Sequence, residues 1–138
     1  MTFLVTVDAS VFVNAFTPTE KGSDQSLAYI TKLRTEQAHL IQPTLFIPEV
    51  IASVARKKND LERALALAQD LKKFGNLTLV TLDENLADYV SEVAARYRLR
   101  GSDAVYAAVA LRFGTELITL DKEQLERLPK ILPVRAPS

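Results

Sequence analysis

Short apolar runs alternate along the chain with longer segments in which apolar residues recur at helical spacing. The short runs contain many β-branched residues and little polar alternation, which is typical of strands buried on both faces of a parallel sheet. Four runs occupy residues 3–7, 39–42, 77–81 and 116–119, and an edge strand is expected within 131–135. Because no hairpin signal separates them, we expect an α/β fold: a three-layer α/β/α sandwich around a central parallel sheet of four to five strands.

Helices are expected in the intervening segments, where residues that start or end helices support the apolar spacing. They cover residues 9–16, a stretch opening at Gly22, 44–58, 59–75, 83–97 with Asp83 as its cap, a stretch closed by Gly114, and a short helix from Asp121. Leu27 and Ile30 are expected on the inner face of the second helix. Asn59 and Glu62 resemble a capping box at the start of the fourth. Its predicted apolar stripe is Leu61, Leu65, Ala68 and Leu71.

One predicted helix lacks a polar face. Residues 104–111 are apolar or small at every position, so this segment should lie in the middle of the domain. Asp103 falls in its first turn, where a buried carboxylate is costly unless hydrogen bonds, a cation or the helix N-terminal dipole offset the lost hydration. The sequence therefore predicts that other groups face Asp103.

Composition limits the chemistry that can surround Asp103. The 138 residues are expected to form one domain spanning 1–138. The chain has no cysteine and one histidine, His39, which excludes disulfides, thiolate zinc sites and imidazole-rich sites. A metal would have to be held by oxygen, which favours Mg²⁺ or Mn²⁺. The formal net charge is zero, so any nucleic-acid binding must rest on a local basic patch.

No membrane segment is expected. The N-terminal apolar run from Phe3 to Val7 is short and is closed by Asp8. It is therefore neither the core of a signal peptide nor a membrane span. We expect a cytoplasmic protein.

Three acidic residues lie where the parallel strands should end together. Asp8 follows the first strand, Asp121 follows the fourth, and Asp103 opens the helix that leads into the fourth. Ligands of such sheets bind outside the carboxyl ends of the strands, so these carboxylates can converge. Glu49 differs, because at about 100° per residue it lies roughly 130° from the centre of its helix's apolar stripe, and periodicity alone leaves it in solvent.

Each aspartate also has a purely structural explanation, which the residues alone leave open. Asp121, followed three positions later by Gln124, fits a helix cap. Asp8 could shape the turn after its strand. Asp103 could be a favourable first-turn charge behind a Ser102 cap.

Four short motifs occur in order along almost the whole chain. They are Val7-Asp8-Ala9-Ser10, Ile47-Pro48-Glu49-Val50, residues 100–110 with the sequence Arg-Gly-Ser-Asp-Ala-Val-Tyr-Ala-Ala-Val-Ala, and Leu117-Ile118-Thr119-Leu120-Asp121. Each motif is weak alone. Taken together at this spacing, they resemble the PIN-domain family, and most closely its single-domain ribonuclease toxins of the VapC type.

The resemblance implies a site and an activity. It implies that an acidic pocket holds Mg²⁺ or Mn²⁺, and that Ser10 and Thr119 supply hydroxyl groups around it. It also implies cleavage of RNA by metal-activated water, leaving 5′-phosphate and 3′-hydroxyl ends, with a cognate antitoxin as partner and a homodimer as the assembly. Leu120 stands where the family commonly has Asn. The implied pocket acids are Asp8, Glu49, Asp103 and Asp121.

Basic residues near the expected pocket could hold RNA phosphates. Arg96, Arg98 and Arg100 precede the buried helix, and Arg56-Lys57-Lys58 ends the helix that carries Glu49. Basic residues also favour helix C-termini through the helix dipole, so this pattern has two explanations. Arg100, the nearest to Asp103, is the strongest candidate for binding substrate.

Other acidic α/β enzymes do not fit the first strand. A haloacid-dehalogenase-type phosphatase needs a second Asp two positions after the first, where this chain has Ser10. A response-regulator receiver needs an acidic pair there, and only Asp8 is present. Two alternatives to a toxin stay open: a non-catalytic PIN-like interaction module, which the neutral net charge favours and the four acids oppose, and a housekeeping RNA-processing nuclease.

Overall fold

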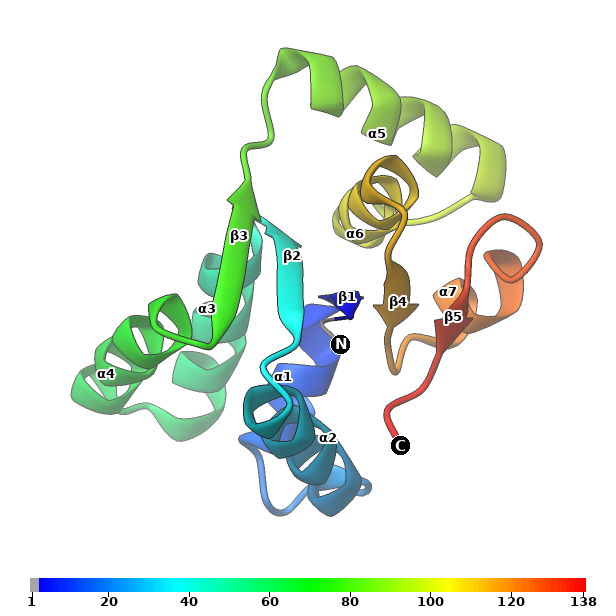
Figure 1. Cartoon of the computed structure of the whole chain (residues 1–138). Coiled ribbons are helices and arrows are strands. Elements are labelled where there is room, and N and C mark those ends of the chain that lie inside the picture. The colour runs from blue at the N-terminus through cyan, green and yellow to red at the C-terminus, as the bar shows by residue number, and fades with distance from the viewer. Residues whose placement is uncertain (1–2) are drawn as a thin grey trace.

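A five-stranded sheet with the order β3-β2-β1-β4-β5 lies between two layers of helices in the computed structural model of the chain (Figure 1). The structure describes residues 3–138, so the first two residues of the expected 1–138 domain lie outside it. Neighbouring strands are parallel in all four pairs, which confirms the expected α/β/α fold. The strands are β1 (Leu4–Val7), β2 (His39–Pro43), β3 (Asn76–Val80), β4 (Glu116–Ile118) and β5 (Val134–Arg135).

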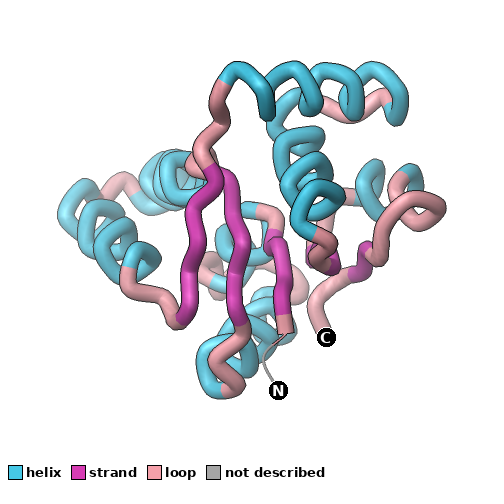
Figure 2. Tube along the Cα trace, turned by 45° about the horizontal axis from the view of Figure 1, so that its top comes forward, coloured by secondary structure: helices cyan, strands magenta, loops and turns pink. Residues whose placement is uncertain are grey.

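The helices of the described residues fall on the two sides of this sheet (Figures 1 and 2). On one side α1 packs against α2 and α3, and α3 packs against α4. On the other, α6 contacts β1, β2 and β4, and α5 packs against α6. The bounds are α1 (Ala9–Ala15), α2 (Ser23–Thr35), α3 (Phe46–Lys58), α4 (Leu61–Lys72), α5 (Glu84–Tyr97), α6 (Gly101–Phe113) and α7 (Lys122–Arg127).

The direction of chain growth reverses at the centre of the sheet. From β1 the chain adds β2 and then β3 on one side, and later returns to place β4 on the other side of β1. Val7 therefore pairs with Ile118 of β4, while Val5 pairs with both Leu40 and Glu116. Ligands of parallel α/β sheets bind at such a switch point, outside the carboxyl ends of the strands. Here that edge lies where β1 and β4 end.

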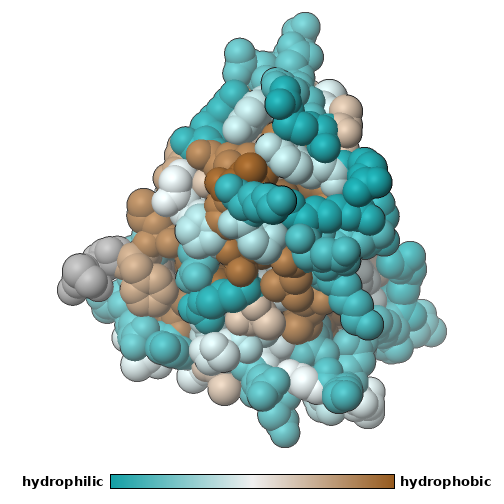
Figure 3. Space-filling view, turned by 90° about the vertical axis from the view of Figure 1, so that its right-hand side faces the viewer, coloured by the Kyte–Doolittle hydropathy of each residue, from teal (hydrophilic) through white to brown (hydrophobic). Residues whose placement is uncertain are grey.

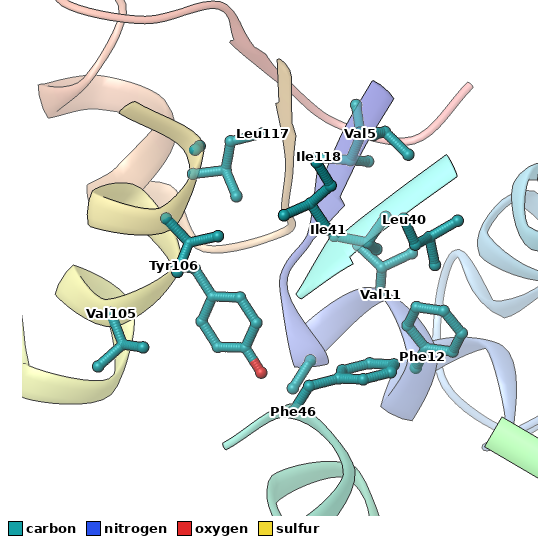
Figure 4. Packing of buried hydrophobic residues seen from close by; sticks show 14 of the residues in the cluster. Val5, Val11, Phe12, Leu40, Ile41, Phe46, Val105, Tyr106, Leu117 and Ile118 are labelled. Carbon is teal, nitrogen blue, oxygen red and sulfur yellow. The ribbon is translucent and has the colours of Figure 1, made fainter. Parts of the chain in front are cut away.

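The helix without a polar face lies in the core, as the sequence predicts. Every residue of α6 from Asp103 to Ala110 is buried, and its alanines let the helix approach the sheet closely. Tyr106 reaches from α6 toward the beginning of α3 (Figure 4). On the opposite face of the sheet Phe12 packs edge-on against Phe46, with ring centroids 4.9 Å apart. Both layers thus share one apolar core.

Two predicted helix faces are wrong in detail. In α4 the side chains of Leu61 and Leu65 are 71% and 55% exposed, whereas Ala64 and Leu71 are buried. The prediction fails because apolar residues surround most of α4, so their spacing does not single out the face that packs against α3. Leu27 of α2 is also exposed, although Ile30 is buried as expected.

Two predicted helix starts also need correction. Asp60, rather than Asn59, caps α4, and its side chain accepts a hydrogen bond from the backbone N–H of Arg63. Asn59 instead ends α3 in the left-handed conformation, at φ 49°. Ser102 lies inside the first turn of α6, whose N-cap is Arg100 without a side-chain cap bond. The Asp83 cap of α5 is confirmed by its bond from Leu86 N–H at 2.8 Å.

The surface mixes polar and apolar residues. On the face nearest β5, apolar residues gather near the centre and polar residues cover most of the remainder (Figure 3). Among residues 3–138 no helix combines the length and the apolar character needed to cross a bilayer. Large apolar side chains are exposed at Leu61, Leu65, Leu79, Leu82 and Phe113.

Candidate functional site

A cavity of about 580 Å³ opens at the carboxyl ends of β1 and β4. Its wall includes the four acids that the sequence singled out, and these come from four separate segments of the chain. Ser10 and Arg100 also line it, but Thr119 does not. The structure therefore brings the predicted acids to one place, at the switch point of the sheet. The four are Asp8, Glu49, Asp103 and Asp121.

Asp8 is fixed by the strands on both sides of it. Its backbone N–H donates to Ile118 O at 2.8 Å, and its Oδ2 accepts from the backbone N–H of Ser10 at 3.0 Å. Next to it, the amide of Gln42 both accepts from Val7 N–H and donates to Val7 O, each at 2.7 Å. A buried glutamine side chain thus completes the ladder where β1 and β2 separate. Burial raises the pKa of Asp8, and the hydrogen bonds from Ser10 oppose that rise.

Arg100 spans the mouth of the cavity between two of the carboxylates. Its Nε donates to Asp103 Oδ2 at 3.0 Å, and its Nη2 donates to Asp121 Oδ2 at 3.1 Å. The Arg100 side chain is 75% exposed, whereas those of Asp103 and Asp121 are 9% and 11% exposed. Other groups do face the buried Asp103, as the sequence predicts, and one of them is the Arg100 guanidinium.

The two carboxylates bridged by Arg100 have opposite pKa shifts. Burial, together with the neighbouring Asp121, raises the pKa of Asp103 to about 7. Burial alone would also raise the pKa of Asp121, but hydrogen bonds from Asp103, the Glu123 backbone N–H and Arg100 lower it overall. Two carboxylates this close do not both ionise readily. The raised pKa of Asp103 therefore favours binding of a proton, or of a cation in its place, near neutral pH.

Asp121 combines the two roles that its sequence left open. Its Oδ1 accepts from the backbone N–H groups of Glu123 and Gln124, at 2.7 and 3.4 Å, and so caps α7. Its Oδ2 faces the cavity and receives Arg100. One carboxylate oxygen stabilises the helix start, while the other is available to the site.

Gln124 is the residue that sequence reasoning missed. It is fully buried, and its Nε2 donates to Asp103 O at 3.0 Å and, at the longer distance of 3.5 Å, to Asp8 Oδ1. Its Oε1 accepts from Thr119 Oγ1, which in turn accepts from Asp121 N–H at 3.0 Å. Gln124 is therefore not the capping-box partner of Asp121, and the Thr119 hydroxyl lies beneath the cavity. No local signal indicates contacts this distant in sequence.

Glu49 lies on the cavity wall rather than in solvent, where the helical wheel placed it. Tyr106 Oη donates to Glu49 Oε1 at 2.8 Å, and Figure 4 shows the Tyr106 hydroxyl pointing from α6 toward α3. The wheel failed because it describes one helix, whereas the buried partner of Glu49 belongs to another. Burial raises the pKa of Glu49, and the Tyr106 hydrogen bond acts in the opposite direction.

The donor set at this cavity is compatible with a hard divalent cation. Every acidic donor is a carboxylate oxygen, the ligand type that Mg²⁺ and Mn²⁺ prefer. Among residues 3–138 no three acidic, histidine or cysteine side chains converge closely enough to form a ready-made metal cage. Mg²⁺ usually takes one or two protein carboxylates and keeps several waters, so its binding does not require such a cage. The raised pKa of Asp103 and the bridging Arg100 both indicate excess negative charge.

A protein-family model matches most of this sequence. The model of the PIN domain matches residues 5–131. The chain belongs to the PIN-domain family. Comparison with curated proteins finds no match in sequence.

Solved structures share the fold over nearly the whole PIN domain. VapC20 of Mycobacterium tuberculosis, described as a sarcin-ricin-loop-cleaving toxin, matches with a TM-score of 0.70 and 14% identity, over 94% of this chain and 99% of its own. VapBC2 of Rickettsia felis, bound to a promoter DNA fragment, matches with a TM-score of 0.71 and 13% identity, over 99% of this chain and 100% of its own. PAE2754 of Pyrobaculum aerophilum matches with a TM-score of 0.60 and 27% identity, over 96% of this chain and 92% of its own. These likenesses show the common fold.

Proposed function

We propose that this PIN-domain chain is a Mg²⁺- or Mn²⁺-dependent endoribonuclease that acts in the cytoplasm as the toxin of a toxin–antitoxin pair. The observation that carries the proposal is the cavity at the sheet's switch point, whose wall carries four carboxylates from separate segments. The description of VapC20 as a toxin that cleaves the sarcin-ricin loop supports RNA as the substrate class.

The carboxylates supply the negative charge that a divalent cation needs. Asp8, Asp103 and Asp121 would hold the ion, and Glu49 would complete its surroundings from α3. When bound, such an ion lowers the pKa of a coordinated water and neutralises charge on the scissile phosphate. The chain has no cysteine, so a thiolate nucleophile is absent and water is the natural attacking group.

The chain's own residues orient the reacting groups. Ser10 N–H and Gln124 hold the Asp8 carboxylate in place. Arg100, which bridges two acids in the free protein, is exposed enough to turn toward a phosphate, and its guanidinium can donate two parallel hydrogen bonds. Ser10 lines the cavity and can contact RNA directly. Thr119 acts from beneath, by positioning Asp121 and Gln124.

A cognate antitoxin is the proposed partner, and a homodimer the proposed assembly. One structure with this fold is described as a toxin–antitoxin complex from Klebsiella pneumoniae, with a TM-score of 0.68 and 17% identity over 97% of this chain and 98% of that one. A short gene beside this one, whose product copurifies with the chain and inhibits it, would support the toxin role. A housekeeping RNA-processing nuclease would lack such a neighbour.

Cleavage of RNA by the purified chain tests the proposed activity. Structured RNA is incubated with wild type and Asp8→Asn in Mg²⁺, Mn²⁺ or EDTA, and the ends of the products are mapped. We expect cleavage only with metal and wild type, leaving 5′-phosphate and 3′-hydroxyl ends. Stable RNA under every condition would favour a non-catalytic interaction module, and cleavage that persists in EDTA would rule out the metal mechanism.

A further inference from the structure

The cavity extends well beyond the acidic residues. Along α3 its wall carries Glu49, Ser53 and Lys57, which are spaced four residues apart and so share one side of the helix. At a rise of about 1.5 Å per residue, the Cα of Lys57 lies about 12 Å along the axis from that of Glu49. One end of the cavity therefore carries the four acids, and the other end carries the Lys57 ammonium beside the carboxylate of Glu20.

Lys57 is the only member of its basic run that faces this cavity. The run Arg56-Lys57-Lys58 ends α3, and the helix dipole could account for all three residues. Of these, Lys57 lines the acidic cavity and Lys58 lines a separate apolar cavity of about 300 Å³ near α4. Consecutive helical residues point about 100° apart, so Lys57 places one charge of the run at the acidic cavity whatever the contribution of the dipole.

The Lys57 side chain is held in position by a supported carboxylate. Its Nζ forms an ion pair with Glu20 in the α1–α2 connection, and both side chains are partly exposed, at 40% and 38%. The buried Asn14 donates to Glu20 Oε1 at 3.2 Å and to Lys21 O at 3.0 Å. Asn14 is itself fixed, because its Oδ1 accepts from Ser26 Oγ at 2.7 Å. Through Asn14, Glu20 is thus held against α1 and α2, and in that position it forms the ion pair with Lys57.

The ion pair with Glu20 orients the Lys57 ammonium and still leaves it able to donate hydrogen bonds to other acceptors. An exposed ion pair contributes little to stability, and an ammonium has three donor hydrogens. Lys57 can therefore keep its bond to Glu20 and still donate to a phosphate oxygen in the cavity. The hydroxyls of Ser10, Ser53 and Ser102, which also line the wall, provide neutral donors and acceptors.

We propose that Lys57, oriented by Glu20, forms a second phosphate-binding subsite for the RNA backbone in the same cavity. Because the Cα atoms of Lys57 and Glu49 lie about 12 Å apart along the helix axis, the subsite at Lys57 is separate from the acids and takes a neighbouring phosphate of the same strand. The cavity then takes a single strand whose scissile phosphate lies at the acids and whose next contact is at Lys57. This inference rests on the proposed nuclease function and adds the direction in which the strand lies.

The salt dependence of RNA binding tests this subsite. Each phosphate contact to a single strand contributes about 0.7 to the slope of log K against log salt. Lys57→Gln should lower the slope by that amount and weaken binding of a mixed-sequence single-stranded oligonucleotide about fivefold at 0.1 M salt. Binding is measured by fluorescence anisotropy in EDTA, which makes it independent of cleavage. Lys57→Arg should preserve the slope.

Lys58→Gln is the matched control, because it removes the same charge one residue away on another side of α3. In Mn²⁺, Lys57→Gln should raise KM for an oligonucleotide and leave both kcat and Mn²⁺-induced thermal stabilisation unchanged. Equal slopes for wild type and Lys57→Gln, or equal losses for Lys57→Gln and Lys58→Gln, would overturn the subsite. Wild type that binds RNA with the predicted Lys57 dependence but never cleaves it would overturn the nuclease proposal alone. Wild type that does not bind RNA would overturn both.

Discussion

Tyr106 joins α6 to α3 through its hydroxyl, which donates to Glu49 Oε1 at 2.8 Å. Tyr106 is fully buried, so the bond aims a carboxylate from the other helical layer at the cavity formed around Asp8. This single contact explains why Glu49 is not in solvent. It also couples the position of one proposed metal-binding acid to the packing of the most buried helix.

Tyr106→Phe should therefore weaken both stability and metal binding. The change removes one hydrogen bond to a charged group and leaves the ring in place, so the free energy of unfolding should fall by about 1.5 to 3 kcal/mol. Glu49 would lose its orientation, and Mn²⁺ should bind more weakly. Urea denaturation and a Mn²⁺ titration measure these effects. Tyr97→Phe, at the end of α5 and outside the lining of the cavity, is the control. Unchanged Mn²⁺ affinity in Tyr106→Phe would remove Glu49 from the metal site.

Stability of the metal-free protein should fall as pH rises. Burial raises the pKa of Asp103 from 3.8 to about 7, so between those values the folded state binds more protons than the unfolded state. The free energy of unfolding then decreases with pH across that window. The raised pKa values of Asp8 and Glu49 act in the same direction, whereas the lowered pKa of Asp121 acts only in more acidic solution.

Melting curves in EDTA from pH 5 to 8 measure this slope. Asp103→Asn removes the buried charge while keeping the shape of the side chain, so the slope should flatten and the melting temperature at pH 8 should rise. A wild-type melting temperature that increases steadily toward pH 8 would show that Asp103 is ionised in the free protein.

Arg100 should compete with the metal for the carboxylates. It supplies positive charge to Asp103 and Asp121 in the free protein, and a divalent ion would replace that charge. Arg100→Gln should therefore lower the melting temperature in EDTA, raise Mn²⁺ affinity several-fold, and weaken RNA binding with a salt slope smaller by about 0.7. Arg96→Gln, which breaks only an exposed pair with Glu92, should change none of these three quantities. If Mn²⁺ affinity falls in Arg100→Gln, the competition is refuted.

The Asp121→Asn variant distinguishes the helix-capping role of Asp121 from its proposed metal-binding role. Asn caps helices about as well as Asp, so α7 should persist. Because the lowered pKa of Asp121 means that its charge stabilises the fold, the metal-free variant should be slightly less stable than wild type. The variant should lose most of the thermal stabilisation that Mg²⁺ gives wild type by binding the folded state. Thermal melts with and without Mg²⁺ measure the difference. Full Mg²⁺ stabilisation together with intact cleavage would leave Asp121 as a helix cap only.

The elements with strong local patterns were predictable from the sequence. The uniformly apolar α6 lies in the core as expected, and Asp8 and Asp121 lie at the ends of β1 and β4 because parallel strands end at one edge. The face of α4 was not predictable, since many of its apolar residues compete and contact with α3 selects among them.

The buried side chains that hold the site residues in place could not be predicted, for a different reason. Gln42 and Gln124 are fully buried amides, yet in the sequence they are a residue at a strand end and a candidate capping partner. Their contacts span 35 residues to Val7 and 116 to Asp8. Only the folded chain brings these groups together, so local pattern carries no information about them.

The most direct test of the account follows metal occupancy and RNA cleavage in the same samples. Mn²⁺ is titrated into wild type and Asp103→Asn, bound Mn²⁺ is measured by electron paramagnetic resonance, and each sample is assayed for cleavage of one structured RNA. We predict that the wild-type rate rises in proportion to bound Mn²⁺ and is absent without it, and that Asp103→Asn folds but loses both binding and cleavage. Cleavage without bound metal, or cleavage by Asp103→Asn at the wild-type rate, would contradict the account.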